Sequence, residues 1–190
     1  MSNMYFTEGR MESQFLATDN VSVIFQSAGA NAAVSDGTLA VLGGFYNDPI
    51  YTSAFGANKV DINTRIATLP ASATDAGIGV ISLVDVPTAS GLGNTYRIGA
   101  PETIGITKEA GKPVRFRKFQ VDDTFFTGSD NCTAALTVGQ YAIVDTTGKW
   151  APSATVPTNG LYAKVISTEK VSRGVTADIT EYFLQIARLA

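Results

Sequence analysis

The chain has 190 residues and a formal net charge of −3. This length allows one or two domains, and this charge gives no general attraction to nucleic acid or to an anionic membrane. There is no histidine, and Cys132 is the single cysteine, which removes the usual general base and metal ligand and excludes an internal disulfide. Charged residues make up 16% of the chain, against about 25% normally. Such depletion is typical of interface cores and equally of an ordinary stable β-protein.

The N-terminal segment, residues 1–19, reads as an arm. It lacks the apolar stretch of a signal peptide, and no apolar run in the chain reaches the roughly 18 residues that cross a bilayer. We therefore expect a protein made in a cytoplasm, with no membrane partner. The apolar residues of the arm, which include Tyr5, Phe6 and Phe15, do not recur with the period of a helix or of a strand. An arm lying on a partner, a flexible terminus and a short helix over 8–17 all stay open.

The first half predicts strands by the period of two. In 20–26, Val21, Val23 and Phe25 would face one side. The strand at 38–42 would end at the breaker Gly43-Gly44. A run that is apolar on both faces predicts a central, buried strand. The four main predictions are strands at 20–26, 38–42, 60–66 and 78–86.

The segment 87–113 is rich in glycine and proline and is the best candidate junction. Short strands are possible inside it at 96–98 and 103–107. The predicted organisation is an arm at 1–19, a first β lobe at 20–100, a junction at 101–112 and a second β lobe at 113–190.

The second half has a clearer rhythm of strands and turns. A turn at Thr146-Thr147-Gly148 predicts a hairpin between 140–145 and 149–151. The last segment, 176–189, would place Tyr182, Leu184 and Ile186 on one face if it is extended, but a helix over 178–189 also fits. Further strands are predicted at 114–119, 124–127 and 161–166, with a polar loop at 169–174.

Many short strands separated by turns every eight to twelve residues indicate an all-β protein. We expect small antiparallel lobes, either sandwich-like or barrel-like (β-tulip or Ig-like), with an extended N-terminal arm.

The residues that could carry chemistry form no recognisable motif. Without histidine, a CxxC pair or an EF-hand loop, we expect no metal site and no cofactor. Asp122, Asp123 and Asp130 lie close in sequence and could hold calcium, although solvated loop carboxylates explain them more simply. Cys132 has no histidine to activate it. We therefore expect that the chain is not an enzyme.

The charge pattern singles out one basic stretch. Residues 108–118 contain five Lys or Arg and one Glu. The run Arg115-Phe116-Arg117 could bind a nucleic-acid backbone with aromatic stacking, dock on an acidic protein patch, or be a solvated edge strand guarded by charge. The net negative charge argues against a nucleic-acid partner. The candidate partner contacts here are Arg115, Arg117 and Lys118.

Three segments of the second half carry a resemblance: Val138-Gly-Gln-Tyr-Ala-Ile-Val-Asp145, Gly148-Lys-Trp-Ala151 and Gly160-Leu-Tyr-Ala-Lys-Val-Ile166. Together they resemble the compact β domains of tailed-bacteriophage capsid decoration (cement) proteins, over about 113–190. The resemblance implies a non-enzymatic virion protein that binds the outside of the capsid and braces capsomer boundaries. No functional residue is carried over from that family.

The resulting expectation is a protein of the virion exterior, with the major capsid protein lattice as partner and with itself as a homo-oligomer, a trimer being favoured. Capsid contacts are expected in the arm, at Tyr5, Phe6 and Phe15, and in the basic stretch. The alternatives are a tail-tube subunit, a receptor-binding fibre domain, or a carbohydrate-binding β-sandwich. In the last, Trp150 would form an aromatic platform with Tyr141 or Tyr162.

Overall fold

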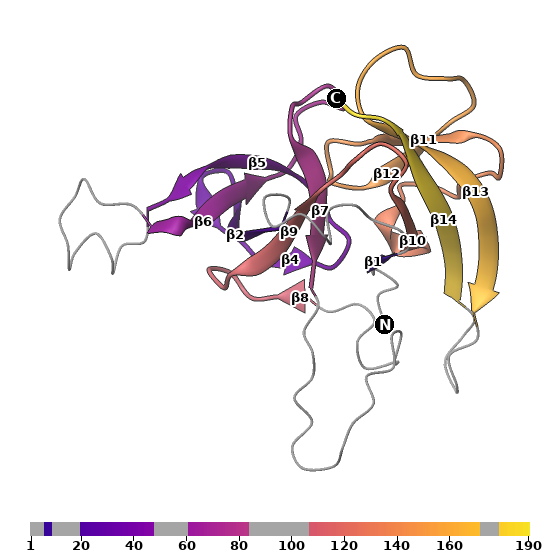
Figure 1. Cartoon of the computed structure of the whole chain (residues 1–190). Helices are drawn as coiled ribbons and strands as arrows, with labels where there is room; N and C mark the ends of the chain where they lie inside the picture. The colour runs from indigo at the N-terminus through magenta and orange to yellow at the C-terminus, as the bar shows by residue number, and fades with distance from the viewer. Residues whose placement is uncertain (1–5, 9–19, 48–60, 84–106, 172–178) are drawn as a thin grey trace.

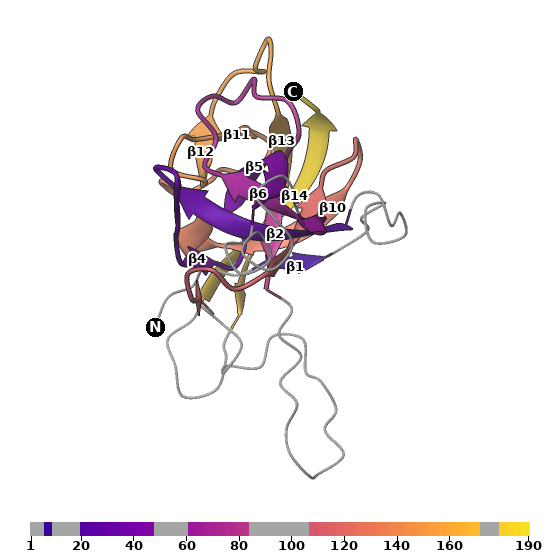
Figure 2. The ribbon, with the colours of Figure 1, turned by 90° about the vertical axis from the view of Figure 1, so that its left-hand side faces the viewer.

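A computed structural model describes residues 6–8, 20–47, 61–83, 107–171 and 179–190 (Figure 1). These residues form strands, with one short 3₁₀ turn, η3 (Ser129–Asn131), as the helical element among them. The prediction of an all-β chain is confirmed. The strands form two bodies that lie side by side (Figures 1 and 2).

The first body is a closed barrel. Its strands follow the order β2-β6-β5-β7-β9, and β9 pairs back onto β2, so no long edge remains open. The β2–β6 pair is parallel and the other barrel pairs are antiparallel. The barrel strands are β2 (Asn20–Ser27), β5 (Leu39–Tyr46), β6 (Asp61–Thr68), β7 (Ile78–Ser82) and β9 (Val114–Lys118). The short strand β3 (Ala30–Asn31) pairs antiparallel with the end of β2, and β4 (Val34–Ser35) pairs with β8 (Thr107–Lys108).

Alternation along each strand separates the inside of the barrel from the outside. Val23, Phe25, Ile81 and Phe116 are buried together in the barrel core. On β5 and β7, the outward-facing residues Leu39, Val41, Ile78 and Val80 are apolar.

The second body is a six-stranded antiparallel sheet in the order β1-β10-β14-β13-β11-β12. The arm contributes β1, which pairs with β10 at one edge of this sheet. At the other edge, β12 contains Pro152, which protects the edge from further pairing. The strands are β1 (Phe6–Glu8), β10 (Thr124–Gly128), β11 (Tyr141–Val144), β12 (Trp150–Ser153), β13 (Tyr162–Val171) and β14 (Ile179–Arg188).

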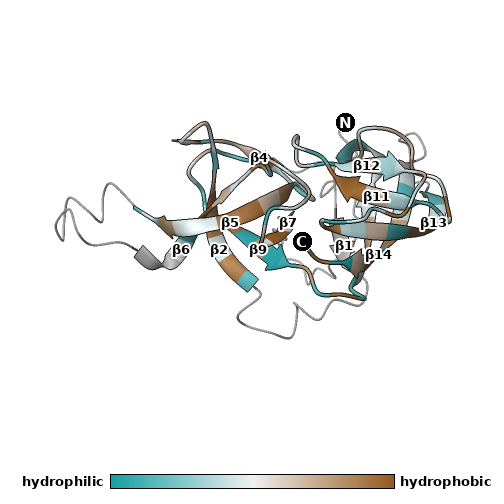
Figure 3. Cartoon of the chain, turned by 90° about the horizontal axis from the view of Figure 1, so that it is seen from above, coloured by the Kyte–Doolittle hydropathy of each residue, from teal (hydrophilic) through white to brown (hydrophobic). Residues whose placement is uncertain are grey.

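The two bodies share one core. Leu39, Ile78 and Val80 on the outside of the barrel pack in the same cluster as the buried residues of the second sheet, and the hydropathy colouring shows apolar stretches on strands of both bodies (Figure 3). Two backbone hydrogen bonds also join them: the Leu39 amide donates to the Gly148 carbonyl at 2.8 Å, and the Leu161 amide donates to the Ala73 carbonyl at 2.8 Å. The bodies therefore form a single packed unit.

Most predicted strands are confirmed, and β7 is buried along its whole length as expected. The last segment is the strand β14, with Tyr182, Leu184 and Ile186 buried, so the helical alternative is wrong. Gly43-Gly44 does not end its strand, because β5 continues to Tyr46 through shifts in register.

The predicted boundary at residue 113 is wrong. Strand β9 belongs to the barrel, where it pairs with β2 and β7, and the second body begins after it. Strand β13 runs to Val171, into the predicted polar loop. The possible helix at 8–17 falls outside the described residues except for Glu8, which is in β1. The candidate strand at 96–98 lies outside them as well, and so does the one at 103–107 except for Thr107, which is in β8.

Candidate partner-binding surface

The basic strand β9 places its charged residues in three different environments. Arg115 and Arg117 both point to the outside of the barrel, and Lys118 is half-buried on the opposite face. Arg115 is exposed, whereas Arg117 is only 5% exposed. Arg117 lies opposite Val80, a member of the core shared by the two bodies, and Arg115 lies opposite Ser82 beyond that core. The expectation that all three residues offer contacts is therefore wrong for Arg117.

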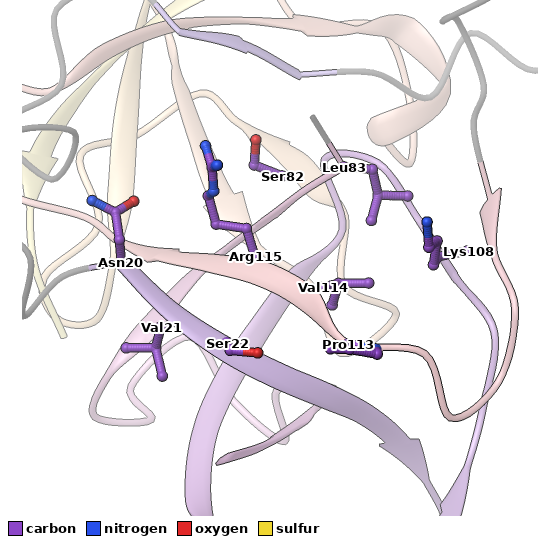
Figure 4. Close-up of a pocket in the computed structure, with 9 residues that line it drawn as sticks. All are labelled: Asn20, Val21, Ser22, Ser82, Leu83, Lys108, Pro113, Val114 and Arg115. Carbon is purple, nitrogen blue, oxygen red and sulfur yellow. The ribbon is translucent and has the colours of Figure 1, made fainter. Parts of the chain in front are cut away.

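Arg115 borders an open cavity of about 330 Å³ (Figure 4). Arg115 is held between two paired strands, with Ser22 of β2 on one side and Ser82 of β7 on the other. In Figure 4 the polar ends of Arg115 and Ser82 point the same way. The lining residues are Asn20, Val21, Ser22, Ser82, Leu83, Lys108, Pro113, Val114 and Arg115.

The cavity is positively charged in a chain of net negative charge. Lys108 and Arg115 are cationic, and none of the nine lining residues is acidic. Within the described part of the chain, Arg115 makes no side-chain hydrogen bond or ion pair. Val114 is buried in the barrel core and Val21 packs against that core, so both side chains face away from the outward-pointing Arg115.

Sequence reasoning missed part of this surface. Lys108 lies in the basic stretch, but the sequence pattern does not single it out as a contact, and Ser22 and Ser82 carry no local signal. Ser22 and Ser82 lie beside Arg115 only because β9 inserts between β2 and β7. A pairing between strands so far apart in sequence leaves no short-range pattern.

The arm residues are placed only in part. Tyr5 and Phe15 lie outside the described residues. Phe6 belongs to β1, where it is the backbone partner of Thr127 in β10. The arm thus contributes a strand to the second sheet.

The acidic residues Asp122 and Asp123 lie in different environments. Asp123 is buried and its Oδ2 accepts a hydrogen bond from the Gln120 amide at 2.7 Å, whereas exposed Asp122 accepts one from Gln185 Nε2 at 3.1 Å. Among the residues that the structure places, there is no group of three or more Asp, Glu, Cys or His suited to a metal ion. Burial raises the pKa of the Cys132 thiol to about 12, which disfavours the nucleophilic thiolate.

Two suggested aromatic sites are not formed. Trp150 is 1% exposed and packs against Phe125, with ring centroids 5.9 Å apart, so it cannot join a surface platform. Tyr141 and Tyr162 meet edge to face at 5.7 Å without it. Phe116 is fully buried in the barrel core and cannot stack on a base.

No known protein family, curated protein or solved structure matches this chain. In the described portion, no helix has the length and apolar character needed to span a membrane.

Proposed function

We propose that this chain is a non-enzymatic structural protein of a bacteriophage virion, which binds the outer surface of the capsid and stabilises capsomer boundaries. The major capsid protein lattice would be its partner, and the chain would act as a homo-oligomer, with a trimer favoured. The proposal starts from the resemblance of its second half to capsid decoration proteins.

One structural observation supports the proposal in addition to the resemblance in sequence. The three segments that bear the resemblance supply three adjacent strands, β12, β11 and β13, with Trp150 of the middle segment in the core. Segments that resemble a compact β domain are expected to pair in this way. The burial of Trp150 also weighs against the carbohydrate-binding alternative, which needed its ring at the surface.

The construction of the molecule suits mechanical bracing. A protein that links capsomers must transmit force without separating into parts, and here a shared core and two direct backbone hydrogen bonds join the two bodies. Contacts of modest strength repeated over a symmetric lattice give high avidity. The exposed cavity around Arg115 and the arm are the proposed contact regions.

The test is sedimentation of the purified chain with expanded heads of the virus that encodes it, prepared without the chain. The proposal predicts saturable cosedimentation with heads. A chain that stays in the supernatant at saturating concentration contradicts the proposal. Polymerisation into tubes without heads supports the tail-tube alternative instead, and glycan-dependent binding to cells supports a receptor-binding or carbohydrate-binding role.

A further inference from the structure

We propose that Asn159 is a site of spontaneous chemical modification, at which the folded chain loses ammonia and the asparagine becomes aspartate or isoaspartate. The site is the turn before β13, where Asn159 is followed by Gly160. This inference goes beyond the proposed function and does not depend on it. The turn lies at the contact between the two bodies, so the modification would change how they are joined.

The reaction needs an asparagine side chain and the backbone nitrogen of the next residue. The Gly160 nitrogen attacks Cγ of Asn159, and a carbon–nitrogen bond forms. The side-chain nitrogen then leaves as ammonia, taking the proton of the backbone amide with it, and a five-membered succinimide ring remains. Water opens this ring at either carbonyl, which gives aspartate or isoaspartate. Because the two groups are neighbours in the chain, the ring closes without the entropy cost of a bimolecular step, and glycine has no Cβ to obstruct the attack.

The two reacting groups at this turn have no competing hydrogen bonds. Asn159 is exposed, so water reaches its side chain and the side chain can rotate toward the backbone. Within the described part of the chain, neither the Asn159 side chain nor the Gly160 backbone nitrogen makes a hydrogen bond. Gly160 itself is buried against Ala73, which opposes removal of its amide proton. The rate in the folded chain, compared with that in a free peptide, measures this opposition.

The chain has one other Asn-Gly or Asp-Gly pair, Asp36-Gly37, and its arrangement is the opposite. Asp36 is buried, and its Oδ1 accepts a hydrogen bond from the Leu83 amide at 2.7 Å. The Gly37 amide donates to the Ile81 carbonyl at 2.9 Å. Both groups that the reaction would use are therefore occupied at 36–37. The structure thus favours modification at 159–160 over modification at 36–37.

The modification would act directly on a backbone contact between the two bodies. A Cβ at Gly160 would lie 2.6 Å from the Ala73 carbonyl oxygen, so the turn has little space to expand. The Leu161 amide donates to the same carbonyl at 2.8 Å. Isoaspartate routes the main chain through the side-chain methylene and lengthens it by one atom just before these contacts, whereas aspartate leaves its length unchanged. Isoaspartate should therefore weaken the junction, and aspartate should not.

The first experiment incubates the full chain at mildly alkaline pH beside a free peptide of sequence 150–164. Trypsin releases the same segment from the chain, and Asn159 is its single asparagine, so mass spectrometry of this peptide measures the conversion of amide to acid. A zero-time sample corrects for conversion during digestion. We expect conversion in the folded chain at a rate within about tenfold of that in the free peptide. Asn131, which is buried and donates to Thr127, is the internal control and should stay unconverted.

The second experiment measures the effect on the junction. Ion exchange isolates the modified chain, fragmentation of the peptide identifies isoaspartate, and urea unfolding is followed by Trp150 fluorescence. We expect a lower unfolding midpoint for the isoaspartate form than for the parent chain. Asn159→Asp is the matched control, because it has the same added charge and a main chain of normal length, and its midpoint should stay close to that of the parent.

Two results would overturn the inference. The first is conversion of the free peptide with none in the folded chain over the same period, because the fold would then block the reaction. The second is an isoaspartate form that unfolds at the same urea concentration as Asn159→Asp, because the length of the turn would then have no bearing on the junction. Neither result depends on binding to capsids, so the proposed function is tested separately.

Discussion

Replacing Gly148 with alanine tests whether the two bodies form one folding unit. Gly148 lies in the turn between β11 and β12 with a φ of 74°, and its carbonyl accepts the hydrogen bond from Leu39 of the barrel. A Cβ at this position would lie 2.8 Å from the Leu39 carbonyl oxygen and 2.8 Å from Leu69 Cδ2. Both distances are well below ordinary van der Waals contact, so the bodies would have to move apart.

The expected cost follows from three destabilising terms and one that offsets them. The left-handed backbone strains an alanine by about 1–2 kcal/mol, and the reduced freedom of the unfolded chain offsets about 0.4–1 kcal/mol of this. Overpacking adds about 1–3 kcal/mol, and loss of the hydrogen bond to Leu39 adds about 0.5–1.5 kcal/mol. Together these terms predict a loss of roughly 2–6 kcal/mol in the free energy of unfolding.

Urea unfolding followed by Trp150 fluorescence measures this loss, because Trp150 is the single tryptophan and lies in the shared core. Gly139→Ala is the matched control: its φ is 83°, but nothing lies within 4 Å of the added Cβ. It should lose only about 1 kcal/mol from backbone strain. Equal losses of unfolding free energy in the two variants would refute the close contact between the two bodies at Gly148.

Three further predictions concern single side chains. Arg117→Ala should lower the free energy of unfolding by about 2 kcal/mol or more, because Arg117 is buried, whereas exposed Arg115→Ala should change it by less than about 0.5 kcal/mol; similar values in urea unfolding would contradict the burial difference. Thr147→Val should raise the pKa of Asp145, because the Thr147 hydroxyl donates to Asp145 Oδ2 at 2.5 Å and holds that pKa low. The stabilisation from this bond is present above the unfolded pKa of about 3.9 and is lost as pH falls through the lower folded value; an unchanged pKa in carboxyl NMR titration would count against it. Cys132, with a pKa of about 12, should react with a thiol reagent at pH 8 only after unfolding, since roughly one thiol in 10⁴ is ionised there, and rapid reaction of the native protein would show that it is accessible.

Local pattern was enough to predict most strands. The spacing of Tyr182, Leu184 and Ile186 at every second position matches the buried face of β14, and the turn around Thr147 matches the β11–β12 hairpin. These features depend on residues close in sequence, so a period of two and a turn motif carry the information.

Non-local pairing was not predictable in the same way. Strand β9 has the pattern of any half-buried strand, and nothing in Val114-Arg-Phe-Arg-Lys118 indicates that it closes a barrel with β2. The burial of Arg117 has the same origin, because it depends on a core built from β5, β7 and the second sheet. For the same reason the sequence showed a basic stretch but not the cavity that Arg115 and Lys108 share.

The most direct test of the proposed role is the stability of DNA-filled capsids of the encoding virus, prepared without this chain and then supplied with it at increasing concentration. The release of DNA on heating is the quantity to measure. The account predicts that the release temperature rises and reaches a plateau as binding saturates. Capsids that bind the chain to saturation yet release DNA at an unchanged temperature, or that bind none of it, would contradict the account.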